Sequence, residues 1–241
     1  MHPILEVKDL KKRYGGKTIV DRLNLSIYPG EVVGLLGPNG AGKTTAFYMT
    51  MGLIHPDEGK VIFNNIDVTE RSIDRRAKMG MGYLAQEPSV FRHLTVRENI
   101  LCILETLPLE KEQQEARLWS LLKELRLDEL ADKKAITLSG GERRRLEITR
   151  ALVTNPLLLL LDEPFANIDP IAISEVKQLI RLLAGKGISV LITDHNAREI
   201  FSLVDRSYLM SDGKVFLSGT IQELLHHPLA REMYLGQDFH L

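Results

Sequence analysis

The sequence has only one cysteine, Cys102, among its 241 residues. A single cysteine excludes an internal disulfide, and it disfavours a thiol-based redox function, which relies on paired or activated cysteines. Such sparse use of cysteine fits a reducing compartment such as the cytoplasm.

Long apolar stretches are missing as well. The longest strongly apolar run, Leu157 to Leu161, is far shorter than the roughly 20 residues that a membrane-spanning helix requires. The N-terminal residues Met1 to Asp9 lack the apolar core of a secretory signal peptide. We therefore expect that any role at a membrane is that of a peripheral partner.

A charge excess of either sign is also absent. The 31 Lys and Arg residues nearly balance the 32 Asp and Glu residues, which gives a formal net charge of −1. No global basic field favours binding to nucleic acid. Six of the seven histidines have no partners at metal-binding spacing, so we interpret them as surface residues.

The sequence does contain a glycine-rich phosphate-binding loop. Residues 37–44 match the pattern G-x-x-x-x-G-K-[ST] at every fixed position. An apolar run precedes the loop and a helical stretch follows it, so backbone N–H groups and a helix N-terminus can surround a polyphosphate. Lys43 would reach the β- and γ-phosphates of a nucleoside triphosphate, and the Thr44 hydroxyl would bind Mg²⁺. The expected nucleotide-binding residues are Gly37, Pro38, Asn39, Gly40, Ala41, Gly42, Lys43, Thr44 and Thr45.

The rest of the chain predicts an α/β fold. Alternating segments at 4–14 and 18–28 predict half-buried strands, whereas the apolar runs at 157–162 and 188–193 predict strands buried on both faces of a parallel sheet. The segment from about 87 to 138 predicts a helical insertion. Further expected elements are strands 61–63 and 80–85, helices 95–107, 111–125 and 171–183, a helix from residue 139, a hairpin of 207–210 with 214–217, and a final helix capped by Thr220 and Glu223.

Two acidic residues, Asp162 and Glu163, follow the apolar run 157–161. A carboxylate at the end of a central strand, beside a phosphate-binding loop, is where Mg²⁺ needs a ligand, and Asp162 is that candidate. Glu163 would point toward the γ-phosphate, where it can orient and deprotonate the attacking water. A solvated strand end is the alternative interpretation.

The stretch Leu138-Ser139-Gly140-Gly141-Glu142 would by itself be read as a helix cap. Together with the phosphate loop and the Asp-Glu pair, in this order, it resembles the signature of the ATP-binding cassette (ABC) family. The resemblance extends from about residue 4 to residue 219. It implies a P-loop NTPase fold with a mainly parallel core sheet, an antiparallel β-subdomain and a helical subdomain at about 87–156. The whole chain, 1–241, would then be one ATP-binding domain with a short tail at about 220–241.

The resemblance also assigns roles to four further residues. Tyr14 matches an aromatic residue that stacks on adenine, and Gln86 matches a glutamine that touches the metal or the water. Asp169 matches a loop that crosses a dimer interface, and His195 matches a histidine that hydrogen-bonds the γ-phosphate. The alternatives are a strand-end tyrosine, a surface glutamine, a helix N-cap and a strand-end histidine.

The family resemblance implies a mechanism in which ATP joins two subunits. The stretch Ser139, Gly140 and Gly141 of one subunit would hold the γ-phosphate of the nucleotide in the other subunit. The reaction is phosphoryl transfer to water, with Lys43, Mg²⁺ and His195 neutralising charge. A homodimer with two equivalent ATP sites is the simplest interpretation, because every motif is intact.

Three kinds of ABC ATPase remain in competition: the motor of an exporter, the motor of a branched-chain amino-acid type importer, and a soluble cassette that acts on DNA or ribosomes. The chain lacks the long coiled coil or second cassette usual in the third kind. Residues 162–166, 192–196 and 234–241 resemble the ATPase subunits of lipopolysaccharide exporters, although Asn167 stands where those have glycine.

On the exporter interpretation, the chain lies on the cytoplasmic face of the inner membrane and does not contact the cargo. Two integral membrane subunits would dock in a groove near Gln86, Phe91 and Arg92. An exposed aromatic beside a cation is a plausible binding hot spot, but Phe91 could equally pack under its own loop. The segment 234–241 could pack on a neighbouring subunit or fray.

Overall fold

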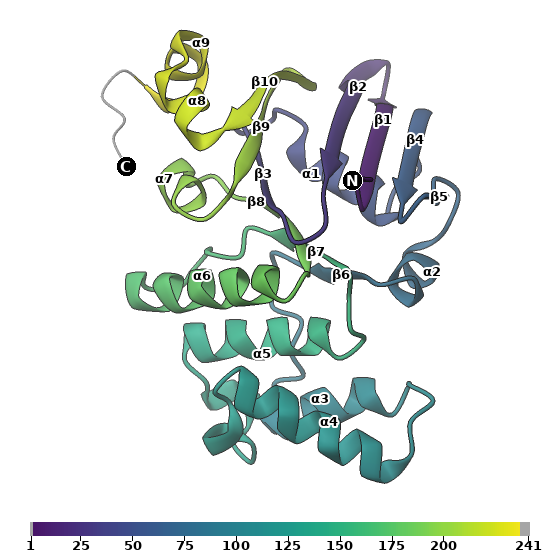
Figure 1. Ribbon diagram of the computed structural model, residues 1–241, viewed down its shortest axis with the longest axis vertical. Coiled ribbons are helices and arrows are strands. Elements are labelled where there is room, and N and C mark those ends of the chain that lie inside the picture. The colour runs from purple at the N-terminus through teal and green to yellow at the C-terminus, as the bar shows by residue number, and fades with distance from the viewer. Residues whose placement is uncertain (1, 237–241) are drawn as a thin grey trace.

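A computed structural model describes residues 2–236 (Figure 1). Its strands form two sheets. The larger sheet has six strands in the order β10-β9-β3-β8-β7-β6, and the smaller has four in the order β2-β1-β4-β5. The strand bounds are β1 Leu5–Tyr14, β2 Lys17–Ile27, β3 Val32–Leu36, β4 Glu58–Phe63, β5 Ile66–Asp67, β6 Met81–Leu84, β7 Leu158–Asp162, β8 Ser189–Thr193, β9 Arg206–Ser211 and β10 Lys214–Thr220.

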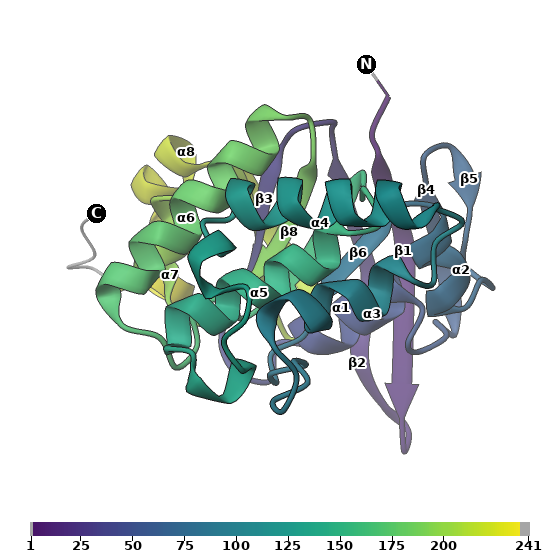
Figure 2. The same ribbon diagram turned by 90° about the horizontal axis from the view of Figure 1, so that it is seen from below.

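The helices gather mainly on one side of the six-stranded sheet, as the view from below shows (Figure 2). The α-helix bounds are α1 Lys43–Met51, α2 Ile73–Lys78, α3 Val96–Leu104, α4 Lys111–Glu124, α5 Gly140–Leu152, α6 Pro170–Gly185, α7 Ala197–Phe201, α8 Ile221–His226 and α9 Pro228–Ala230. Short 3-10 turns occupy Asp128–Leu130 and Ala135–Thr137, and a π turn covers Arg231–Leu235. Within residues 2–236, we find no helix with the length and apolar character needed to cross a bilayer.

The six-stranded sheet is the centre of the core. Its strands β3, β8, β7 and β6 pair in parallel, β9 joins β3 in parallel, and only β10 runs antiparallel. Successive residues of a strand point to opposite faces. Leu159 and Leu161 therefore pack with the helices α3–α6, whereas Leu158 and Leu160 pack toward α1 and the smaller sheet. Burial on both faces explains why this strand is apolar at every position before Asp162.

The four-stranded sheet is antiparallel and packs over α1. Its longest pair, β1 with β2, turns through Gly15 and Gly16, which have φ values of 54° and 82°. Both values lie in the left-handed region that a two-residue hairpin turn requires and that glycine adopts without a steric cost. The turn leaves Tyr14 at the tip of β1, next to its cross-strand partner Lys17.

The short helix α2 was not anticipated from the sequence, and it fixes the end of the P-loop helix α1. Its fully buried Arg76 donates from Nη1 to the carbonyl oxygens of Met49 and Thr50, at 2.9 and 2.6 Å. Burial lowers the pKa of Arg76 to about 10. The guanidinium is nevertheless well placed, because the C-terminal carbonyls of a helix carry a partial negative charge.

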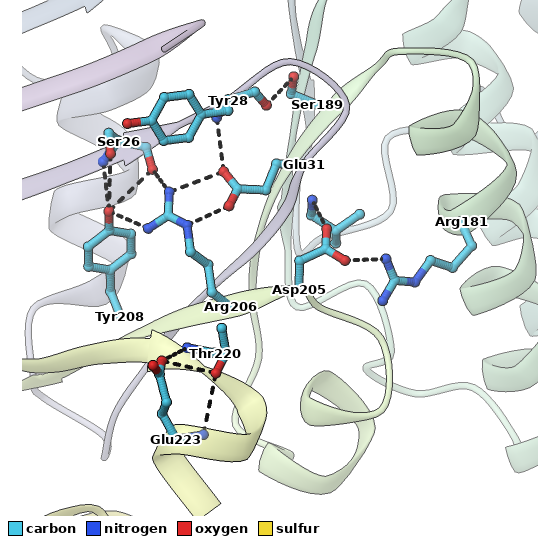
Figure 3. A network of polar contacts seen from close by, with 11 residues as sticks. Ser26, Tyr28, Glu31, Arg181, Ser189, Asp205, Arg206, Tyr208, Thr220 and Glu223 are labelled. Atoms are coloured by element: carbon cyan, nitrogen blue, oxygen red, sulfur yellow. Dashed lines mark hydrogen bonds and ion pairs between the residues drawn. The ribbon is translucent and has the colours of Figure 1, made fainter. Parts of the chain in front are cut away.

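A polar network ties the smaller sheet to the larger one (Figure 3). Arg206 on β9 donates from Nε and Nη2 to the two carboxylate oxygens of Glu31, at 2.5 and 3.1 Å. The same guanidinium donates to the hydroxyl of Tyr208 at 2.6 Å and to the carbonyl oxygen of Ser26 at the end of β2. The network therefore sets the position of β2 relative to the strand β3 that leads into the phosphate loop.

Candidate nucleotide-binding site

The candidate site lies where the carboxyl ends of neighbouring parallel strands meet. The loop 37–42 follows β3, Asp194 and His195 follow β8, Glu163 follows β7, and Gln86 comes soon after β6. Because β3, β8, β7 and β6 are adjacent in this order, the topology brings these segments to one edge of the sheet.

The phosphate loop depends on two glycines for its shape. Gly37 has φ 156°, and a Cβ built on it would lie 2.2 Å from the carbonyl oxygen of Met210. Gly42 has φ 97°, and its Cβ would lie 2.6 Å from the carbonyl oxygen of Ile19. Any side chain would therefore displace the loop from β9 or from β2. Gly42 caps α1, whose first turn has no acidic residue to oppose an incoming anion.

Lys43 folds back across its own loop. Its Nζ donates to the carbonyl oxygens of Gly37 and Pro38, at 2.8 and 3.0 Å, and the residue is buried. Burial lowers the pKa of Lys43, while the charges of Glu163, Asp162 and Asp194 act in the opposite direction. One ammonium group is thus placed among three carboxylates, and Thr44 beside it is exposed.

Asp162 is the most strongly perturbed acid at this edge. It is 3% exposed. Burial raises its pKa to about 6, and the neighbouring charge of Glu163 adds to the effect. A buried carboxylate next to a second one favours any bound cation, because a cation offsets both the desolvation and the repulsion.

Glu163 lies close to Gln86 and His195, two residues predicted from the family resemblance. Its Oε2 accepts a hydrogen bond from Gln86 Nε2 at 2.8 Å and lies 3.8 Å from His195 Nδ1. His195 is also 3.5 Å from the carboxylate of Asp194. The structure therefore groups Glu163, Gln86 and His195 beside Asp162, with the His195 side chain 64% exposed.

Arg144 links this edge to the signature helix α5, and the sequence analysis missed it. Its buried guanidinium donates to the carbonyl oxygens of Ala85 at 3.2 Å, Glu163 at 3.0 Å and Pro164 at 2.9 Å. It also forms an ion pair with Glu147 at 2.8 Å. The contacts with Ala85 and Pro164 join segments that are far apart in the chain, so no local sequence pattern marked Arg144.

The signature stretch and Asp169 lie at the starts of two neighbouring helices, α5 and α6. Ser139 caps α5 by accepting from the N–H of Glu142, and Asp169 caps α6 by accepting from two backbone N–H groups. A Cβ on Gly141 would lie 2.7 Å from that of Ala172, so glycine permits the close approach of the two helix starts. A hollow of about 260 Å³ lies there, and none of residues 37–45 lines it. Gly140 opens the same helix.

Asn167, a position where the family resemblance leads us to expect glycine, has φ 59°. This is the left-handed region that glycine enters freely and that asparagine tolerates better than most residues. The backbone shape of the loop before Asp169 is thus compatible with the substitution.

Tyr14 and Phe91 are both exposed aromatics. Tyr14 is 48% exposed at the tip of β1, and Phe91 is 51% exposed in the loop before α3. The backbone of Phe91 is fixed by the buried Asn99, which accepts from its N–H at 2.8 Å and donates to its carbonyl oxygen at 3.0 Å. The cation over the Phe91 ring is Arg150, 4.9 Å from the centroid, and Arg92 is exposed beside it.

The predicted tail segment is described only in part. Tyr234 and Leu235 pack against the core formed by the larger sheet and its helices. Residues 237–241, which belong to the same predicted segment, lie outside the described residues.

The chain is similar to known proteins. Residues 20–166 match the family described as ABC transporter. The chain is 49% identical over 241 residues to the "Lipopolysaccharide export system ATP-binding protein LptB" of Acidithiobacillus ferridurans, and the match covers 100% of both chains.

Two solved structures are also similar. One is the ADP conformation of MJ1267, an ATP-binding cassette of an ABC transporter. It has a TM-score of 0.89 and 31% identity, and the match covers 98% of this chain and 100% of that one. The other is a dimeric post-hydrolysis state of the cassette MJ0796 bound to ADP and Pi. It has a TM-score of 0.78 and 28% identity, and the match covers 90% and 98% of the two chains.

Proposed function

The chain belongs to the ABC transporter family, and we propose that it hydrolyses ATP to drive the export of lipopolysaccharide from the inner membrane. The observation that carries the proposal is the 49% identity to a lipopolysaccharide-export ATP-binding protein over the full length of both chains. The grouping of Lys43, Asp162, Glu163, Gln86 and His195 at one sheet edge supports the chemistry.

In this proposal the loop 37–45 binds the triphosphate of ATP. The N-terminus of α1 supplies N–H groups and a partial positive charge. Lys43 exchanges its two carbonyl contacts for phosphate oxygens, a favourable exchange because a charged acceptor forms a stronger hydrogen bond than a neutral one. The ring of Tyr14 stacks on adenine.

Mg²⁺ fits the donor set of the site. Among residues 2–236, no cluster of three or more His, Cys, Asp or Glu side chains is arranged to hold a metal by itself. In this proposal the ligands are Asp162, Thr44 and Gln86 together with phosphate oxygens, because Mg²⁺ in P-loop proteins is held by few side chains and by the nucleotide. When bound, Mg²⁺ neutralises charge on the β- and γ-phosphates. The raised pKa of Asp162, caused mainly by burial, supports this assignment, because a bound cation would favour the ionised carboxylate.

For hydrolysis we assign Glu163 as the general base that takes a proton from the attacking water. Gln86 Nε2 holds the carboxylate at 2.8 Å, which fixes the direction in which its second oxygen points. His195, exposed beside it, donates to the γ-phosphate. Phosphoryl transfer depends on such positioning more than on covalent chemistry by the protein.

The proposed active form is a homodimer with ATP at the interface. Ser139, Gly141 and Asp169 line a hollow that no residue of the phosphate loop 37–45 lines, and Gly140 opens the helix α5 between Ser139 and Gly141. A second copy would bring this α5 N-terminus onto the γ-phosphate. The similar cassette MJ0796 forms a dimer in its ADP- and Pi-bound state.

We further propose that two integral membrane subunits dock on the surface around Gln86, Phe91 and Arg92, and that the chain is peripheral to the cytoplasmic face of the inner membrane. Phe91 is 51% exposed, and its backbone is fixed by Asn99. A rigid, exposed aromatic beside cations is suited to anchor a partner helix. The ATPase itself contacts neither the cargo nor nucleic acid.

The test is affinity purification of the tagged chain from detergent-solubilised native membranes, with the partners identified by mass. We expect two membrane proteins with β-rich periplasmic domains, together with ATPase activity. A tagged Phe91→Ala chain serves as the matched control for docking. Recovery of compact permeases stimulated by an amino-acid-binding protein would instead indicate an importer. Recovery of no membrane protein would contradict both transport functions.

A further inference from the structure

We propose that Lys12 and Asp57 form a positioning pair that orients Tyr14 for stacking on the base of ATP. The inference rests on the proposed ATP-binding function and concerns how the base end of that site is built. Neither residue belongs to a sequence motif that the ATP-binding assignment uses. Both are identified only by their contacts.

Lys12 lies beside Tyr14 because of the strand geometry. The two residues are separated by one position on β1, and side chains at i and i+2 share one face of a strand. The Nζ atom of Lys12 lies 5.6 Å from the centroid of the Tyr14 ring. An ammonium group at this distance is attracted to the π face of an aromatic ring. One face of the ring is thus in contact with the protein's own cation, which leaves the opposite face for a planar base.

Asp57 holds this cation in place. Its Oδ1 accepts from Lys12 Nζ at 2.8 Å, and the carbonyl oxygen of His55 accepts from the same ammonium at 2.7 Å. With two acceptors, the Lys12 side chain is only 14% exposed, although Asp57 itself is 39% exposed. A lysine so held has lost most of its rotamer freedom before a ligand arrives, so ordering it costs the ligand little.

Asp57 also fixes the backbone that leads to Tyr14. Its Oδ2 accepts from the N–H of Arg13 at 2.7 Å, and its own N–H donates to the carbonyl oxygen of Lys11 at 2.8 Å. The last register pair of β1 with β4 is Lys11 with Glu58. Asp57 directly precedes β4, so its carboxylate extends the pairing of β1 past the first residue of β4. The extension reaches Arg13, the residue before Tyr14.

The same turn connects the two ends of the nucleotide site. The helix α1, which starts at the phosphate loop, ends at Met51, and residues 52–57 lead directly from it to the pair. Lys12 donates a hydrogen bond to the carbonyl oxygen of His55, which lies in the segment 52–57. This bond fixes the position of the adenine-stacking ring relative to α1, the helix that binds the phosphates. A stacking ring placed in this way selects bases at a fixed distance from the triphosphate.

The test separates the base from the phosphates. Binding of ATP and of inorganic tripolyphosphate, which has no base, is measured by calorimetry for the unmodified chain, Lys12→Met and Asp57→Asn. We expect ATP to bind roughly three- to tenfold more weakly to each variant, the range expected for loss of one cation–π contact. Binding of tripolyphosphate should change by less than about twofold. Lys8→Met is the matched control, because Lys8 lies on the same strand and pairs with Glu6 instead.

A second measurement shows whether Lys12 acts through the tyrosine. In a Tyr14→Ala background, Lys12→Met should have no further effect on ATP affinity. An additional loss there, or an equal loss for tripolyphosphate, would overturn the positioning role, since the ammonium would then contact the phosphates or support the loop. Unchanged ATP affinity in both single variants would overturn it as well. If the unmodified chain binds neither ATP nor tripolyphosphate, it is the proposed function that fails. Lys43→Ala is the negative control, because it gives the calorimetric signal of a chain that does not bind phosphates.

Discussion

At the scale of single residues, the backbone of Glu163 shows how the candidate base is held. Its φ of 44° places a non-glycine residue in the left-handed region, a conformation that costs on the order of 1–3 kcal/mol. The residue is fixed there by hydrogen bonds of its N–H to the carbonyl of Thr193 at 2.8 Å and of its carbonyl with Ala166 N–H and the Arg144 guanidinium. The sharp turn directs the carboxylate toward Gln86 and His195.

We predict that Glu163→Gln binds ATP and dimerises but barely turns it over. Glutamine keeps the shape and one acceptor for Gln86, but it cannot accept the proton of the attacking water. Loss of a general base corresponds to a fall of roughly 10²- to 10⁴-fold in kcat. Steady-state ATPase assays and size-exclusion chromatography with ATP test the two parts. Glu105→Gln, an exposed site on the far end of α3, is the control, and normal turnover by Glu163→Gln would contradict the assignment.

At the scale of elements, the attachment of β2 to β9 depends on the Arg206 network (Figure 3). The side chains of Arg206 and Glu31 are only 20% and 16% exposed. Glu31 also accepts from the N–H of Tyr28 at 2.9 Å. A half-buried pair of this kind is costly to break, because the remaining carboxylate keeps its desolvation without its partner.

We predict that Arg206→Met destabilises the chain by about 2 kcal/mol, less than a fully buried pair because water still reaches both groups. For a chain of this size, that corresponds to a fall of roughly 4–8 °C in Tm. Thermal unfolding at a fixed scan rate measures the change. Arg181→Met is the matched control, since its pair with Asp205 is 45% and 44% exposed and should contribute under about 1 kcal/mol. Equal shifts for both variants would rule out a special role of the network.

Elements with a strong local signal could be predicted from the sequence. The buried run ending at Asp162 indicated a parallel strand, and the predicted helix starts at residues 95, 139 and 220 coincide with capping boxes at Thr95, Ser139 and Thr220 in the structure. The short helices α2 and α7 were missed, because five or six residues carry too little periodicity. Arg76 lies on one of them, and nothing local marks it as buried.

The site could be predicted only as a set of motifs, and its contacts are set by the tertiary fold. Asp162, Glu163 and the phosphate loop were recognisable because each combines a residue type with a strand or helix end. The contacts of Arg144 with Ala85 and Pro164 join segments that are about 60 and 20 positions apart in the chain. No local pattern reports such contacts, and the same holds for Lys12 with Asp57.

At the scale of the whole molecule, the helical layer α3–α6 and the sheet edge are mechanically connected. Arg144 on α5 bonds the carbonyls of Ala85 and Glu163, whose neighbours include Gln86. Arg150, on the same helix, lies over the ring of Phe91 and donates to the carbonyl oxygen of Ser89. One helix thus touches both the residues proposed for hydrolysis and the surface proposed for docking. A partner that moves the loop 86–92 would act on Glu163 through α5.

We expect Phe91→Ala to affect assembly with the membrane subunits but not the ATPase activity of the isolated chain. We predict that the isolated variant folds and keeps ATPase activity within about twofold, because Phe91 is 51% exposed and its backbone is held by Asn99. Assembly with the membrane subunits should fail, since truncating an aromatic hot spot weakens binding by about 2 kcal/mol or more, roughly 30-fold. Co-purification from detergent-solubilised membranes measures assembly, and the ATPase rate of the free chain measures the site.

Trp119→Ala on α4 is the matched control, because it also removes the ring of a partly exposed aromatic residue, and Trp119 is 37% exposed. The control should assemble normally, since its ring lies on a different helix from Arg150 and the loop 86–92. Insoluble Phe91→Ala would assign the ring to packing beneath its own loop. Normal assembly would move the docking surface elsewhere. Failure of assembly with intact turnover is the result that joins the exposed ring to the membrane subunits, because the ring is then needed only when a partner is present.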